Sequence, residues 1–247
     1  MKKLSAIVLA LLVVITAFPA AAFAHSDDES VCDSGSCWTI SFDTQSMGME
    51  QLKNARGLGN YVVEDGRHIK SRTLFRSGAL CDASESDLDD LQHEYHISCI
   101  IDLRPLSEAE AHPDPAVKGA RIISCPVNRV RLATDPENQK SFAKVFQALL
   151  QADGRPVLFH DTDGCDQAGF VSALILSALG AGEDTILSDY RISNEYFGSS
   201  VVSEPSFQAL LRFIDIRYGG MDSYLTNTVG VSGKDVHRLR NAYLEKS

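Results

Sequence analysis

An apolar strand pattern, a polar loop and a helical pattern follow one another without a break at residues 157–179. The run from Val157 to His160 is too short for a helix and typical of a buried strand. The loop from Asp161 to Asp166 leads directly into a helical pattern that begins at Gln167. A tight turn of this kind points successive backbone N–H groups inward, and the helix N-terminus adds partial positive charge. The segment therefore predicts an anion cradle between a strand and a helix.

Strand patterns alternate with helical patterns along most of the chain, which has no linker, repeat or low-complexity block. This alternation predicts one α/β domain with a central, largely parallel sheet and helices on both faces. In such sheets ligands bind where strands end and loops lead into helices. The predicted strands are Trp38–Phe42, Tyr61–Val63, Thr73–Arg76, Ile97–Leu103, Arg121–Val127 and Pro156–His160. The predicted helices are Ser84–Tyr95, Lys140–Ala152, Gln167–Leu179, Phe207–Arg217 and Gly233–Leu244.

The first 24 residues have the pattern of a secretory signal peptide. A basic start precedes an almost wholly apolar run, and a small-x-small pattern ends at Ala24. An uncleaved membrane anchor is the alternative, but Pro19 and the cleavage pattern favour removal. We expect a signal peptide at 1–24, a polar mobile leader at 25–36 and a folded domain at 37–247, in a secreted or periplasmic protein without membrane contact after cleavage.

Acidic residues outnumber basic ones by 33 to 23, and loss of Lys2 and Lys3 with the signal peptide deepens the net charge from −10 to −12. This balance argues against nucleic acid as a partner, because phosphate backbones are bound mainly by clustered Lys and Arg.

All six cysteines follow the predicted cleavage site, where an oxidising compartment allows disulfides. Cys32 and Cys37 are the easiest pair to close. Cys99 and Cys125 sit in apolar runs that also suit buried thiols. The cysteine spacings match no zinc pattern, and neither a metal nor a cofactor is expected from them.

The loop segment HDTDGCDQAGF at 160–170 resembles H-C-T-A-G-K-D-R-T-G, the signature of bacterial protein-tyrosine phosphatases of the lipid-phosphatase-like, type 3 branch. Other family segments are matched in the same order by RGLGNY at 56–61, DGR at 65–67, LFRSGAL at 74–80, IDLR at 101–104, and DY and SN within 189–194. The resemblance covers about residues 50–245. It implies a cysteine-phosphatase fold and, as partner, a phosphorylated protein or a phosphoinositide.

This chain departs from the family where phosphoryl transfer takes place. The family's attacking Cys, which reacts as a thiolate, is Asp161 here, and the Arg that clamps phosphate with its planar fork is Gln167. The resemblance places the catalytic positions at Asp161, Asp166 and Gln167. The rest of the phosphate loop consists of His160, Thr162, Asp163, Gly164, Cys165, Ala168 and Gly169. The same resemblance predicts that the pocket is lined by Arg76, Asp102, Arg104 and Glu108.

Three interpretations follow from a loop that carries three acids and no cation. In the first, phosphatase activity is impaired because a phosphate dianion would be repelled by Asp161, Asp163 and Asp166, and the Asp161 carboxylate accepts the N–H bonds that phosphate would have accepted. In the second, Asp161 is a nucleophile in an active phosphatase. In the third, the acidic loop binds Ca²⁺ or Mg²⁺. We expect the first, a pseudophosphatase or binding module.

Overall fold

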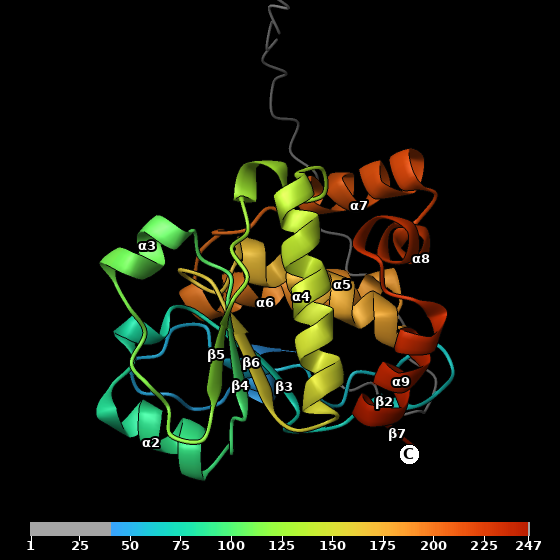
Figure 1. Ribbon diagram of the computed structural model, residues 1–247. Helices are drawn as coiled ribbons and strands as arrows, with labels where there is room; N and C mark the ends of the chain where they lie inside the picture. The colour runs from blue at the N-terminus through green and yellow to red at the C-terminus, as the bar shows by residue number, and fades with distance from the viewer. Residues whose placement is uncertain (1–40, 247) are drawn as a thin grey trace, which may run out of the picture. The chain divides into compact units, whose positions relative to one another are not determined.

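A five-stranded sheet lies at the centre of the part of the chain that the computed structural model describes, residues 41–246 (Figure 1). In spatial order its strands are β1 (Arg56–Gly57), β3 (Leu74–Ser77), β6 (Val157–His160), β4 (Cys99–Asp102) and β5 (Arg121–Ser124). Only β1 runs antiparallel to its neighbour, and the other three pairings are parallel. The prediction of a largely parallel sheet is therefore confirmed.

Alternate residues of the central strands enter two separate cores, because successive side chains of a strand point to opposite faces. Ile101 and Phe159 pack into the larger core, which also contains residues of α4 (Pro136–Ala152) and α5 (Asp166–Leu179). Ile100 and Leu158 pack into the smaller core with Leu91 of α2 (Glu85–His93). Figure 1 shows α2 and α3 (Leu106–Ala111) on one side of the sheet and α4 and α5 on the other. Both faces of the sheet are covered, as the sequence predicts.

The five predicted helices are all present, within a few residues of their predicted limits. The largest shift is in α4, which begins at Pro136 because Asp135 caps it and proline suits a first helical turn. Four helices of the described part were not predicted: α1 (Phe42–Gln45), α3, α6 (Glu183–Phe197) and α8 (Met221–Tyr224). The remaining helices are α7 (Glu204–Tyr218) and α9 (Gly233–Tyr243), and a π-helical turn spans Leu225–Val229.

The predicted strand Tyr61–Val63 is wrong, and so is the end of Trp38–Phe42 that lies within the described residues. Phe42 begins the short helix α1 (Phe42–Gln45), which Ser41 opens with a reciprocal capping box. In the segment 61–63 only Val62 forms an isolated bridge, to His68. The extended pairing at this place is a small sheet between β2 (His68–Ile69) and β7 (Leu244–Glu245).

Several predictions lie outside residues 41–246: the signal peptide, the leader, the Cys32–Cys37 pair and the strand residues before Ser41. Within the described part, Cys81, Cys99, Cys125 and Cys165 are all free thiols. None of the helices described there combines the length and the hydropathy needed to cross a membrane.

Candidate functional site

The strand register brings the ends of three strands to one edge of the sheet. Ser77 of β3 and Asp102 of β4 both pair with His160 at the end of β6. The loop at 161–165 continues from this row into α5. Gly164 must be glycine, since its φ is +76° and a Cβ atom would lie 2.8 Å from the Ser77 carbonyl carbon. The predicted strand-to-helix turn thus stands at the edge where parallel sheets place their sites.

The Asp161 carboxylate fills the centre of this turn and is fully buried. Its Oδ1 atom accepts hydrogen bonds from the N–H groups of Asp163 at 3.2 Å and Gly164 at 2.5 Å. Its Oδ2 atom accepts from the N–H groups of Gln167 at 2.8 Å and Ala168 at 3.1 Å. Burial raises the pKa of Asp161, and the N–H groups of Ala168 and Gly164 act in the opposite direction. The cradle that the sequence predicts for an external anion holds an anion of the protein's own.

Two buried arginines lie on the core side of the loop and share the carboxylate of Asp189. Arg76 donates from Nη2 to the carbonyl oxygen of Gly164 at 2.7 Å, and its Nη1 lies 2.5 Å from Asp189 Oδ2. Arg56 Nε lies 3.6 Å from the other oxygen of Asp189. The predicted pocket-lining role of Arg76 is therefore wrong: its guanidinium is buried in the core and pairs with Asp189, since this acid projects from α6 toward both arginines.

The charges of this buried group balance. Arg56 and Arg76 face Asp161 and Asp189, and none of the four residues is more than 1% exposed. Burial acts to raise the pKa of Asp189, but Arg76 and Arg56 bring it below its usual value. Burial, followed by repulsion from Arg76, lowers the pKa of Arg56 to about 10. The two carboxylates compensate the free-energy cost of burying two guanidinium groups.

Asn54 is a further support that sequence reasoning missed. Its Nδ2 atom donates to the carbonyl oxygens of Asp163 and Gly164 at 3.2 and 3.1 Å, and its Oδ1 atom accepts from Arg56 Nη1 at 2.5 Å. Its place two residues before the RGLGNY segment is the only signal that could have pointed to it.

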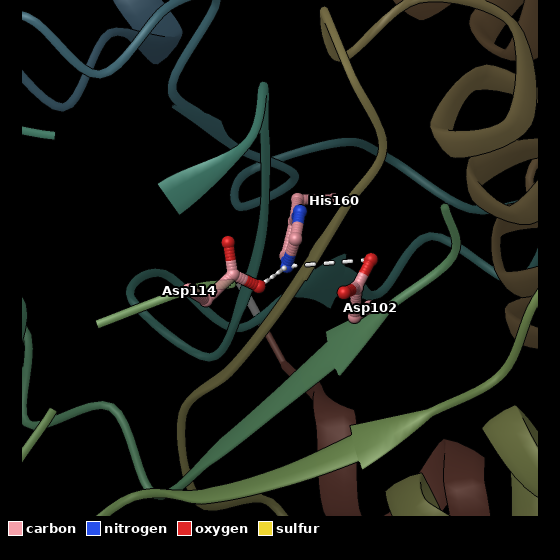
Figure 2. A group of neighbouring side chains, drawn as sticks. All are labelled: Asp102, Asp114 and His160. Carbon is pink, nitrogen blue, oxygen red and sulfur yellow. Dashed lines mark ion pairs between the residues drawn. The ribbon is translucent and has the colours of Figure 1, made fainter. Parts of the chain in front are cut away.

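A second buried network surrounds His160 (Figure 2). Its Nε2 atom lies 3.0 Å from Asp114 Oδ2 and 3.9 Å from Asp102 Oδ1. Arg104 Nη2 lies 2.8 Å from Asp102 Oδ2 and 2.9 Å from Asp114 Oδ2. Burial acts to raise the pKa of Asp114, but the hydrogen bond with His160 and the charge of Arg104 bring it below its usual value. Asp102 and Arg104 were predicted to line the pocket, which is wrong, because each is neutralised inside this network.

Acidic groups in the described part of the chain offer little to a metal ion. The carboxylates of Asp161, Asp163 and Asp166 do not form a group able to hold one ion, since Asp161 is turned inward onto the backbone. Only Asp102, Asp114 and His160 bring their ligand atoms close enough together among residues 41–246. The Arg104 guanidinium already bridges these two carboxylates, so a divalent cation would have to displace it.

A cavity of about 900 Å³ opens above the loop. Thr162, Asp163, Asp166 and Gln167 form its floor, and of the four predicted pocket residues only Glu108 lines it. Glu108 Oε1 accepts a hydrogen bond from Thr162 Oγ1 at 2.7 Å. The remaining wall is formed by Pro105, Leu106, Ser107, Pro126, Val127, Asn128, Arg129, Asp135, Glu137 and Asn138.

Among the described residues, Arg129 is the one basic residue in the lining of this cavity. Sequence reasoning missed it, although it comes two residues after the predicted strand Arg121–Val127. It is largely exposed, and its Nη1 atom lies 3.9 Å from Asp166 Oδ2. Glu108, Asp135, Glu137, Asp163 and Asp166 contribute five carboxylates to the same lining. The mouth of the loop is thus strongly acidic.

Cys165 faces away from this cavity and is 3% exposed. Burial and the neighbouring Asp163 raise the pKa of its thiol to about 12. Gly169 allows α5 to approach α6 closely, since a Cβ atom there would lie 2.8 Å from the Tyr190 ring. Both residues therefore position the loop and the helix that follows it.

Known proteins resemble this chain over most of its length. Residues 47–245 match the sequence profile of the tyrosine phosphatase family. The "Putative tyrosine-protein phosphatase" of Cupriavidus necator is 28% identical over 246 residues, which cover 80% of this chain and 88% of that protein. The "Triple specificity protein phosphatase PtpB" of Mycobacterium tuberculosis is 52% identical over 46 residues, 19% of this chain and 17% of that protein.

Among solved structures, P. aeruginosa TpbA in complex with pTyr aligns with a TM-score of 0.40 and 18% identity, over 71% of this chain and 88% of that one. The family assignment depends on the sequence profile, which spans the sheet, the loop and the C-terminal helices. This protein belongs to the tyrosine phosphatase family.

Proposed function

We propose that this protein is a pseudophosphatase, a binding module that has lost phosphoryl transfer. The observation that carries this proposal is the Asp161 carboxylate, which takes four backbone N–H bonds inside the cradle. A phosphoryl group needs those same donors for its oxygens. The protein's own carboxylate therefore competes with a substrate phosphoryl group for these donors whenever the loop is folded.

Neither Asp161 nor Cys165 of the loop is placed to act as an alternative nucleophile. Both oxygens of Asp161 are bonded to backbone, and Asp161 is not among the described residues that line the cavity. The Cys165 thiol is buried, and its raised pKa keeps it protonated near neutral pH. Gln167 lacks the charge and the planar fork that would clamp a phosphoryl group. These features support a binding role over a carboxylate-nucleophile phosphatase.

Activity measurements test this proposal. Purified protein should not hydrolyse p-nitrophenyl phosphate above background. Turnover that disappears in Asp161→Ala would overturn the proposal in favour of the carboxylate nucleophile. The double variant Asp161→Cys/Gln167→Arg should gain affinity for tungstate, a phosphate mimic, as a ligand-dependent rise in Tm. Asp161→Cys/Gln167→Lys is the matched control, because it restores the charge without the fork, and its gain should be smaller.

We further propose that the protein is exported after cleavage between Ala24 and His25. The basic start, the apolar run and the small residues before His25 support this. In a bacterium that expresses the full chain, the processed protein should begin at His25 and appear outside the cytoplasm. A chain that keeps residues 1–24 and stays with the membrane fraction would contradict cleavage.

A further inference from the structure

The lining of the cavity above the loop is mainly negative, whereas a phosphate site needs positive charge. Asp163 and Glu108 have no ion pair with a basic side chain within the described residues, although both line the cavity. Two other acids of the lining are already neutralised at the rim: Asp135 lies 3.4 Å from Arg131, and Glu137 lies 2.7 Å from Lys140. Asp166 has one distant partner, Arg129 Nη1 at 3.9 Å. The acids without an ion pair are therefore Asp163 at the floor and Glu108, which accepts a hydrogen bond from Thr162 of the floor.

Gln167 provides an independent sign of a ligand. It lines the cavity and is only 6% exposed, yet its side-chain amide has no hydrogen-bond partner in the described part of the chain. Its polar atoms are open to the cavity and are not sealed inside the protein, so a ligand in the cavity can reach them. The vacant oxygen of Gln167 accepts hydrogen bonds, and it stands beside carboxylates that also accept. A ligand with several N–H donors and a positive charge can donate to the amide oxygen and also pair with the carboxylates.

The apolar walls of the cavity favour a ligand whose cation is carried by an apolar stem. Pro105, Pro126 and Val127 line the cavity between its acidic floor and its mouth. Leu106, which lines the wall, is 55% exposed, and Val130, the residue after Arg129 in the chain, is 83% exposed. A lysine or arginine side chain combines an aliphatic stem with a terminal cation, and the residues that flank it in a polypeptide can cover Leu106.

We propose that this cavity binds a basic side chain, lysine or arginine, presented by a polypeptide partner with apolar residues beside it. The proposal rests on the proposed loss of phosphoryl transfer, and it assigns a ligand class to the same site. The cation lies at the floor beside Asp163 and donates to the Gln167 amide oxygen, while its stem packs against the prolines. Asp166 and Glu108 contribute negative charge to the same cavity without contacting the cation together with Asp163. Asp161 takes no part, because the backbone holds it inside the cradle.

Binding of a designed peptide tests this assignment. The probe is a dye-labelled, acetylated and amidated peptide of leucine and alanine with one central lysine, and the comparison peptide has glutamine in place of lysine. The wild type should bind the lysine peptide with higher affinity, and binding should weaken as ionic strength rises. Asp163→Asn/Asp166→Asn should weaken it about tenfold, since each lost ion pair is only partly shielded from water.

The matched control is Glu85→Gln/Asp184→Asn, which removes two exposed acids from the first turns of α2 and α6 and should leave the affinity unchanged. If the loop variant fails to fold, Glu108→Gln on α3 should weaken binding, since it removes the charge and keeps an amide oxygen that can accept the hydrogen bond from Thr162. Equal affinity of the two peptides, or an unchanged affinity in both cavity variants, would overturn the inference. Binding of spermidine without binding of the lysine peptide would also overturn the inference, because the ligand would then be a small polyamine and not a polypeptide.

The two proposals fail separately. If the protein shows neither phosphatase turnover nor peptide binding, the ligand assignment is contradicted and the proposal of a pseudophosphatase is not. Turnover of p-nitrophenyl phosphate by the wild type would contradict the pseudophosphatase whatever the peptide does.

Discussion

Asp161→Ala is expected to produce a protein whose stability depends on phosphate. In the wild type four backbone N–H groups donate to the Asp161 carboxylate. Alanine leaves these donors and the two buried arginines short of one negative charge. Breaking a buried charge arrangement in this way costs about 3–5 kcal/mol. Phosphate that enters the empty cradle should restore about 2.7 kcal/mol when present at a hundred times its Kd.

Thermal unfolding in increasing phosphate measures this effect. For a chain of this size the restored free energy corresponds to a rise in Tm of about 5–10 °C. The wild type should show no comparable rise, because its cradle is occupied. Asp163→Ala is the matched control: it removes an exposed carboxylate from the same loop without emptying the cradle. A variant that is destabilised but gains nothing from phosphate would show that the loop collapses when its carboxylate is removed.

Asp189→Leu is expected to cause a comparable loss of stability, about 3–5 kcal/mol, without creating a ligand site. Asp189 lies 2.5 Å from Arg76 and 3.6 Å from Arg56, and it also accepts hydrogen bonds from Ser172 at 2.7 Å and Tyr61 at 3.1 Å. Leucine leaves two buried guanidinium groups with Asp161 as their only compensating acid.

Urea unfolding of single and double variants distinguishes a charge effect from a packing effect. Arg76→Leu/Asp189→Leu should lose less stability than the sum of the two single variants, because the charge removed on each side no longer faces an unpaired partner. Asp184→Asn, an exposed acid on the same helix, is the control and should change stability by less than about 0.5 kcal/mol. Additive losses in the double variant would argue that packing, and not charge balance, dominates at Asp189.

Local patterns predicted the parts of the fold that depend on neighbouring residues. The β6 strand is apolar throughout and the loop after it is polar, so the turn and the start of α5 followed from sequence. The position of Asp161 inside the cradle also agrees with the sequence-based expectation, because backbone N–H groups two to seven residues away converge on it.

Pairings between distant residues could not be predicted in the same way. Arg76 and Asp189 are separated by 113 positions, and Asn54 and Gly164 by 110. Arg76 and Asp102 both belong to family segments near the site, but which acid faces which arginine depends on how α6 and the segment before β5 pack. The helix α6 itself was missed because Gly182 precedes it without a capping side chain. Asp114 lies in an irregular segment with no pattern to single it out.

The oxygen anion of Asp161 has a chemical consequence for the durability of the loop. A thiolate at this position would be the group in the cradle most open to peroxide, passing through sulfenic acid to irreversible states. A carboxylate carries the same charge and cannot be oxidised along that ladder. The one sulfur left in the loop, Cys165, is buried and protonated. The negative charge at the centre of this loop is therefore carried by a group that peroxide does not oxidise.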